Sequence, residues 1–266
     1  MSFKEKYGPY ALVTGGTSGI GEAMTIQLAE KGLNIVLVAR RQNLLEEKAQ
    51  SLKSKYGVEV KTIQADLTKS EDIQKVIEGT NDLEIGLLIP CAALENHGLI
   101  TKVSLADELA LIQLNVTTVF ALTHHFSTKM VERKRGGILL VASLIGHMPN
   151  PYFSNYAASK AYVLNLGTSL NGELKKYGID VSVLSPGPTK TPMLTESDMD
   201  FSKLPMSIQE PEYVAKVGLD ALGNKPVVIP GFKNNMMVKM TNMMPLKVAI
   251  NMGAKMVEKV IDPSLL

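Results

Sequence analysis

The stretch Thr14-Gly15-Gly16-Thr17-Ser18-Gly19-Ile20-Gly21 decides the fold that this sequence predicts. It follows the short apolar run Tyr10–Thr14 and precedes an amphipathic segment over residues 19–32. Glycines at such a junction let the backbone turn tightly and approach a pyrophosphate, whose charge faces the N-terminus of the following helix. The spacing departs from the usual GxGxxG pattern, and a glycine-rich turn without a ligand is the alternative. A strand, this loop and a helix indicate the first unit of a dinucleotide-binding sheet.

The rest of the chain repeats this alternation of short apolar runs and longer amphipathic segments. Six more strands are expected over residues 34–39, 58–64, 86–90, 137–142, 179–184 and 226–229. Helices are expected over residues 42–56, 70–79 (with Ser70 as its cap), 104–134, 155–177 and 210–222. Seven strands separated by helices predict a doubly wound α/β domain whose parallel sheet is flanked by helices. Ligands of such sheets bind beyond the carboxyl ends of the strands.

Length and composition indicate a soluble protein with one main domain. The 266 residues are 45% hydrophobic and 20% charged, and the net charge of +2 gives no argument for nucleic acid. A single cysteine, Cys91, fits a reducing compartment. The first residues form no signal peptide, and no uninterrupted apolar run is long enough to span a bilayer. We therefore expect a cytoplasmic protein, with a domain over residues 1–231 and an extension over residues 232–266.

The second loop of the predicted sheet indicates which dinucleotide binds. Arg40 and Arg41 stand about twenty residues after the glycine-rich loop, where an acidic residue normally holds the ribose hydroxyl of NAD. Two guanidinium groups offer planar, permanently charged donors for a 2′-phosphate instead. The alternative is a pair of solvated charges at the start of a helix. We expect NADP(H) as the cofactor.

A phenol and an ammonium lie four residues apart in Tyr156-Ala157-Ala158-Ser159-Lys160. On a helix this spacing places both on one face, where the cation would lower the pKa of Tyr156 toward an acid/base range. A lone Tyr-x-x-x-Lys is weak evidence, because chance produces it often. Ser143, at the end of a predicted strand, could donate to a carbonyl oxygen. Asn115 lies in the middle of a predicted helix, which requires a specific partner for its amide.

In order and spacing, these pieces resemble the short-chain dehydrogenase/reductase family to about residue 229. The resemblance implies a Rossmann-like fold and a catalytic site of Ser143, Tyr156, Lys160 and Asn115. Tyr156 would exchange the proton with the substrate, and Ser143 would hold the substrate oxygen. Lys160 would lower the pKa of Tyr156 and bind the nicotinamide ribose. Asn115 would hold a water molecule that relays the proton. Asp66 would touch the adenine and Thr191 the nicotinamide carboxamide. The cofactor-binding residues would be Gly15, Thr17, Ser18, Gly19, Ile20, Gly21, Arg40, Arg41, Asp66, Leu67, Tyr156, Lys160, Pro186, Gly187, Thr189 and Thr191.

One motif departs from the family pattern. Pro90-Cys91-Ala92-Ala93 stands where the family usually carries Asn-Asn-Ala-Gly. The small residues still allow the cofactor to pass closely, but the amides that brace neighbouring strands are gone. Cys91 is expected to be a small packing residue rather than a nucleophile.

A narrower resemblance concerns the substrate. The opening Glu5-Lys6-Tyr7-Gly8, the double arginine, the altered motif and the 94–98 loop are similar to bacterial 7β-hydroxysteroid dehydrogenases and related ketoacyl and steroid reductases. We expect hydride transfer between NADP(H) and an apolar ketone or secondary alcohol, either steroid-like or acyl. The alternative is a non-catalytic NADP(H)-binding regulatory protein.

An apolar loop over residues 187–207 is predicted to cover the substrate, with ordinary helix packing as the alternative. Its candidate contacts are Met193, Leu194, Met199, Phe201, Leu204 and Met206. His97 and His147 are candidates for the mouth of the pocket, although each could be a polar loop residue. No residues have the spacing of metal ligands, so no metal is expected.

The tail beyond Gly231 alternates methionines with lysines and is broken at Pro245. Two short basic amphipathic helices would fit, with Met236, Met240 and Met243 on one face. These helices could pack on the domain or a partner subunit, cover an apolar substrate, or lie on a membrane surface. The resembled family pairs the helices that carry Asn115 and Tyr156 between subunits, which implies a homodimer or homotetramer.

Overall fold

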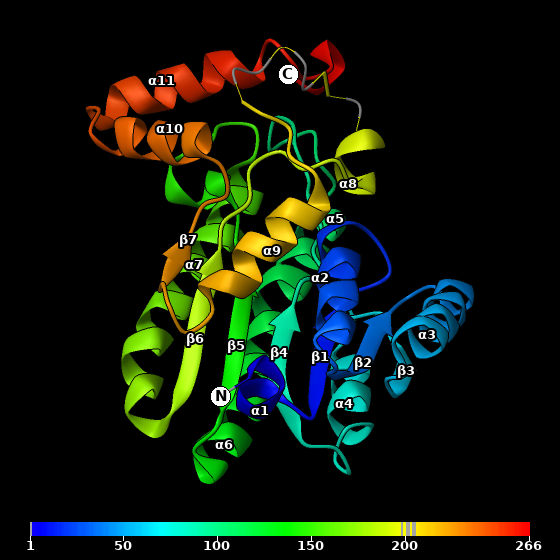
Figure 1. The fold of residues 1–266 in the computed structure, drawn as a ribbon. Helices are drawn as coiled ribbons and strands as arrows, with labels where there is room; N and C mark the ends of the chain where they lie inside the picture. Colours follow the sequence, from blue (N-terminus) through cyan, green and yellow to red (C-terminus); the bar gives the residue numbers. More distant parts are fainter. Residues whose placement is uncertain (1, 198, 201–202, 204–205) are drawn as a thin grey trace.

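The protein is described here from a computed structural model that covers residues 2–197, 199–200, 203 and 206–266. Seven parallel strands form one sheet in the order β3-β2-β1-β4-β5-β6-β7 (Figure 1). The predicted doubly wound, Rossmann-like fold is therefore confirmed. The strands are β1 (Tyr10–Thr14), β2 (Asn34–Ala39), β3 (Val60–Gln64), β4 (Ile85–Pro90), β5 (Gly136–Val141), β6 (Ile179–Leu184) and β7 (Val227–Val228).

Helices cover both faces of the sheet because successive strand residues point to opposite sides. On β1, Val13 belongs to the apolar core under α2 (Gly19–Glu30), α3 (Gln42–Tyr56) and α9 (Pro211–Ala221). Its neighbour Leu12 belongs to the core on the other face, under α4 (Ser70–Glu78), α6 (Val119–Arg133) and α7 (Ser154–Leu174). The chain order of the strands reverses between β1 and β4, which is where such folds bind ligands.

The helix predicted over residues 104–134 is divided. Two α-helices, α5 (Leu105–Ile112) and α6, flank a wider π-helical turn, η1 (Gln113–Thr118). Such turns are frequent at functional sites, and this one contains Asn115. The continuous stretch Leu105–Arg133 is long and apolar enough to cross a membrane by length and composition, but α6 packs on β4 and β5 here.

Several local elements differ from the sequence prediction. Ser70 is the first residue of α4 rather than its cap, which is Lys69 and makes no side-chain cap bond. Some short helices lack a long apolar repeat and were not predicted. They are α1 (Phe3–Tyr7), η2 (Leu144–His147) and α8 (Pro192–Thr195). The helix predicted over residues 155–177 is α7 with the short helix η3 (Lys175–Tyr177) at its end.

The methionine-rich tail forms the two predicted helices, α10 (Phe232–Asn242) and α11 (Leu246–Val257), followed by the short helix η5 (Pro263–Leu265). Pro245 precedes the first residue of α11 and separates the two helices. Both lie beyond the carboxyl ends of the strands, at the top of Figure 1. The tail therefore lies at the end of the domain where the ligand loops converge.

Candidate active site

A cavity of about 420 Å³ opens at the carboxyl ends of the strands. Of the eighteen positions predicted for catalysis or cofactor binding, all except Asn115 line it. They come from the loops after β1, β2, β3, β5 and β6 and from the first turns of α2 and α7. The fold thus brings together residues that are up to 176 positions apart, from Gly15 to Thr191.

The backbone of the glycine-rich loop turns tightly and leaves no room for side chains, which allows a ligand to approach it closely. Gly15 has a φ of +67° and its N–H donates to the Val38 carbonyl at 2.9 Å. A Cβ on Gly21 would stand 2.4 Å from the Gly15 carbonyl oxygen, so only glycine fits there. Helix α2 begins at Gly19 and directs its free N–H groups toward the cavity end of the sheet. These features fit a pyrophosphate against the start of α2.

Charged groups mark the adenosine side of the cavity. Arg40 and Arg41 are both exposed at the cavity rim, between β2 and α3. Burial alone would raise the pKa of Asp66, but hydrogen bonds from Thr68 and the charge of Arg40 lower it. A negatively charged Asp66 and exposed guanidinium groups offer separate sites for an amine-bearing base and a phosphate.

Tyr156 and Lys160 lie on one face of α7, as their spacing predicts, and both are buried. The Lys160 Nζ is 5.7 Å from the centre of the Tyr156 ring and donates to the Val141 carbonyl at 3.1 Å. Burial lowers the pKa of Lys160 to about 8. These contacts fix the ammonium beside the phenol through the backbone of β5.

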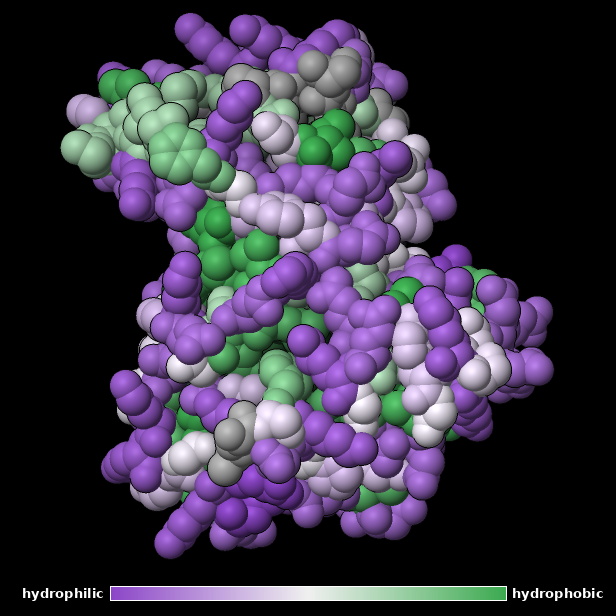
Figure 2. All heavy atoms as spheres, viewed as in Figure 1, coloured by the Kyte–Doolittle hydropathy of each residue, from purple (hydrophilic) through white to green (hydrophobic). Residues whose placement is uncertain are grey.

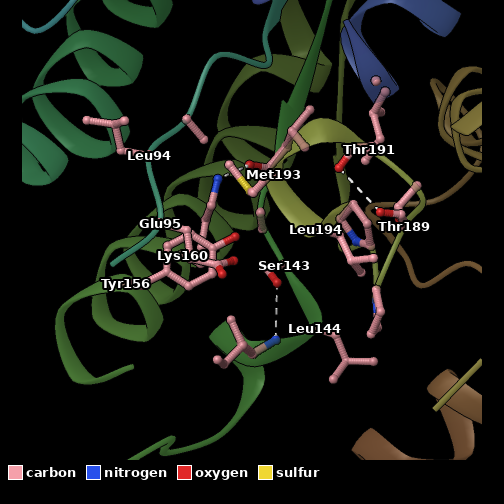
Figure 3. Close-up of a pocket in the computed structure, with 18 of the residues that line it drawn as sticks. Leu94, Glu95, Ser143, Leu144, Tyr156, Lys160, Thr189, Thr191, Met193 and Leu194 are labelled. Atoms are coloured by element: carbon pink, nitrogen blue, oxygen red, sulfur yellow. Dashed lines mark hydrogen bonds between the residues drawn. The ribbon is translucent and has the colours of Figure 1, made fainter. Parts of the chain in front are cut away.

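The pKa of Tyr156 moves in the direction opposite to the prediction made from Lys160 alone. Burial raises it most, the carboxylate of Glu95 raises it further, and a hydrogen bond with Ser143 lowers it. The phenol is therefore protonated at neutral pH, the form that donates a proton. Figure 3 shows Tyr156, Lys160 and Glu95 clustered together, with the Ser143 hydroxyl on the neighbouring loop.

Glu95 is a cavity residue that the sequence analysis missed. It lies five residues after Pro90 at the end of β4, and burial raises its pKa to about 7, although His97 and Lys160 lower it. Its side chain lines the cavity next to Tyr156. A carboxylate directly after the apolar run 85–94, at the carboxyl end of a parallel strand, is the signal that would have found it.

Asn115 does not line the cavity. Its amide oxygen accepts from the Leu94 N–H at 2.9 Å, and its amide nitrogen donates to the Leu94 carbonyl at 2.8 Å and to the Ser159 Oγ at 3.2 Å. The side chain therefore braces the loop that carries Glu95 against α7. The relay-water role stays a prediction, and the described contacts give Asn115 a positioning role.

The altered motif after β4 fits tightly against the glycine-rich loop. The Ala92 N–H donates to the Thr14 Oγ1 at 3.0 Å, and a Cβ on Gly15 would stand 2.9 Å from the Ala92 Cα. Burial raises the pKa of Cys91 to about 11, so its thiol is protonated at neutral pH. This protonation agrees with a packing role for Cys91.

The other half of the cavity is apolar. The predicted loop contributes Met193, Leu194, Met199 and Met206, whereas Phe201 and Leu204 lie outside the described residues. Further methionines come from the residue after η2 and from the tail, at Met148, Met237, Met252 and Met256. His97 and His147 are not among the described lining residues; His147 Nε2 lies 2.9 Å from the Ser185 Oγ.

Residues 9–201 match the family model described as short chain dehydrogenase. The chain belongs to the short-chain dehydrogenase family. It is therefore an oxidoreductase of the kind that interconverts CH–OH and C=O groups. A 7β-hydroxysteroid dehydrogenase of Clostridium sardiniense is 34% identical over 244 residues, which cover 92% of this chain and 94% of the relative.

Solved structures of this family have the same fold. A structure that addresses 7β-hydroxysteroid dehydrogenase stereoselectivity matches with a TM-score of 0.87 at 29% identity, covering 95% of this chain and 99% of the other. A short-chain dehydrogenase from Sphingobium yanoikuyae, in complex with NADPH, matches with a TM-score of 0.79 at 29% identity, covering 89% and 96%.

Proposed function

We propose that this protein transfers hydride between NADP(H) and an apolar ketone or secondary alcohol of steroid or long acyl type. The observation that carries the proposal is the composition of one continuous cavity. Arg40 and Arg41 stand at one end, buried Tyr156 and Lys160 stand in the middle, and methionines line the other end. A charged cofactor and an apolar substrate can meet only at the phenol in such a cavity.

The glycine-rich loop and the two arginines support NADP(H) as the cofactor, which on binding supplies or accepts the hydride. Gly15 and Gly21 leave room for the pyrophosphate at the start of α2. Arg40 and Arg41 are placed to bind a 2′-phosphate, and Asp66 faces the same end of the cavity. Thr189 and Thr191, in the loop after β6, line the same cavity. Thr191 lies close to Gly19, since a Cβ added to Gly19 would contact Thr191 Cγ2.

During reduction, the Tyr156 hydroxyl gives its proton to the carbonyl oxygen as that oxygen gains negative charge. Ser143 donates a hydrogen bond to the same oxygen and so limits the charge that develops there. In the reverse direction, the tyrosinate takes the proton from the alcohol. Lys160, held by the Val141 carbonyl, keeps a positive charge beside Tyr156 below about pH 8. We expect reduction to be favoured at neutral pH, because the phenol is then in its donating form.

The apolar end supports a bulky hydrophobic substrate. Methionine side chains are flexible and polarisable, which suits an irregular hydrocarbon surface better than a polar sugar or amino acid. The relatives named 7β-hydroxysteroid dehydrogenase support a steroid ketone as the first substrate to test.

An NADPH-consumption screen over steroid, aliphatic and acyl ketones tests this proposal. We expect turnover with at least one bulky apolar ketone and much less with small polar ketones. Tight NADPH binding without consumption of NADPH by any ketone would support the regulatory alternative instead.

A further inference from the structure

The two tail helices carry an exposed apolar surface. We call it the tail face, and it comprises Phe232, Met236, Met240 and Met243 with Leu246 and Ile250. Phe232 and Met243 are 79% and 86% exposed. Figure 2 shows apolar residues gathered over the region of α10 and α11. Contiguous exposed apolar surface of this kind marks an interaction site.

The stripe on α10 is narrow and regular. Phe232, Met236, Met240 and Met243 are spaced by four, four and three residues, so they share one side of the helix. The opposite side, with Asn234, Val238 and Thr241, is buried. At about 100° per residue, Lys233 and Lys239 lie at the two edges of the exposed stripe. An apolar stripe bordered by lysines is typical of helices that lie in a membrane interface.

The charged residues of α10 and α11 all have one sign. The segment from residue 221 to 257 contains five lysines and no aspartate or glutamate. If a second copy of the chain paired through this face, the lysines of both copies would come close together. Residues 221–257 carry no carboxylates that would neutralise them. A surface of anionic headgroups would neutralise the same lysines. The charge pattern therefore favours a membrane over self-association.

The position of the tail face connects it to the cavity. Met237 and Thr241 on α10, and Met252, Gly253 and Met256 on α11, line the cavity, so the same two helices contribute residues both to the cavity and to the tail face. An apolar substrate dissolved in a bilayer would meet helices that contact the bilayer and also line the cavity that binds the substrate. We propose that the tail face docks the protein on an anionic membrane surface, with α10 lying in the headgroup region.

Vesicle co-sedimentation of the full chain tests this inference without depending on turnover. We expect binding to phosphatidylcholine vesicles that contain phosphatidylglycerol, and weaker binding to phosphatidylcholine alone or at high salt. Replacing Lys233, Lys239 and Lys247 with Glu should weaken binding to the anionic vesicles roughly a hundredfold. Replacing Phe232, Met240 and Met243 with Ser should weaken it about tenfold or more.

Controls separate docking from folding and from self-association. Leu109→Ser and Phe120→Ser change exposed apolar residues on α5 and α6 and should leave vesicle binding unchanged. Circular dichroism should show that all variants keep the fold. The inference is overturned if the wild-type chain stays unbound with anionic vesicles, or if the Ser variant binds as well as wild type. It is also overturned if sedimentation velocity shows that the Ser variant loses a dimer that the wild type forms, because a second copy then covers the face.

Discussion

The two sides of the cavity differ in how they are held. The proposed catalytic side consists of Ser143, Tyr156 and Lys160. Tyr156 and Lys160 are buried there on α7, and Lys160 donates a hydrogen bond to the Val141 carbonyl of the sheet. The tail side consists of α10 and α11, whose inner faces supply methionines and whose outer face is exposed. In the function proposed here, the chemistry would depend on a rigid geometry, whereas substrate size and the proposed membrane contact would depend on an adaptable surface.

Tyr156→Phe should show the largest effect, because it removes only the hydroxyl that carries the proton. We expect kcat for ketone reduction to fall about a thousandfold, within the range for loss of a general acid. NADPH fluorescence titration should show nearly unchanged cofactor affinity. Tyr162→Phe, on the exposed side of the same helix, is the matched control and should keep full activity.

Replacing both Arg40 and Arg41 with Ala tests the cofactor end of the catalytic side. Loss of one charge-assisted contact costs about 1.5–3 kcal/mol, so NADPH affinity should fall roughly tenfold to a hundredfold or more. NADH affinity, measured by the same calorimetric titration, should change little because NADH lacks the 2′-phosphate. Equal losses for both cofactors would assign the arginines another role.

Glu95→Gln tests the electrostatics around the phenol. The Glu95 carboxylate raises the pKa of Tyr156, so its removal should lower that pKa. Alcohol oxidation needs the tyrosinate, and the rising limb of its pH–rate profile should move to lower pH by about one unit. Glu196→Gln, which removes an exposed carboxylate, is the control. An unshifted profile would show that Glu95 does not influence the pKa of the group that exchanges the proton.

Met256→Ala should have the smallest effect and should act on binding rather than chemistry. Loss of roughly 1 kcal/mol of apolar contact predicts a three- to tenfold higher KM for a bulky ketone, with kcat nearly constant. Met243→Ala, on the exposed face, should leave both constants unchanged in solution. A large fall in kcat for Met256→Ala would contradict the division between the two sides.

The sequence predicted which residues of the proposed catalytic side line one cavity, because the signals are local. Glycines at a strand–helix junction, alternating apolar runs and the four-residue spacing of Tyr156 and Lys160 each have a direct structural meaning. Strands β1, β2 and β6 and helix α3 match the predicted bounds. Ser143 followed from the position of a strand end, since parallel strands bring their carboxyl ends to one edge, whereas Thr191 followed from the family resemblance.

Other features depend on tertiary contacts and could not be predicted in the same way. The π-helical turn around Asn115 has no distinctive pattern within an apolar helix, and its amide bonds to Leu94 join segments far apart in the chain. The direction of the pKa shift of Tyr156 depends on its burial and on Glu95, neither of which its own sequence neighbours reveal. The inner methionines of the tail became recognisable only once α10 and α11 were placed over the cavity.

The most direct test of the account is to follow the transferred hydride. NADPH deuterated at C4 on the transferred side would be incubated with a bulky ketone, and the product analysed by mass spectrometry. We predict one deuterium on the carbinol carbon of the alcohol formed by the wild-type protein, and almost no product from Tyr156→Phe under the same conditions. Unlabelled alcohol from the wild-type protein, or undiminished product from Tyr156→Phe, would contradict the proposed chemistry.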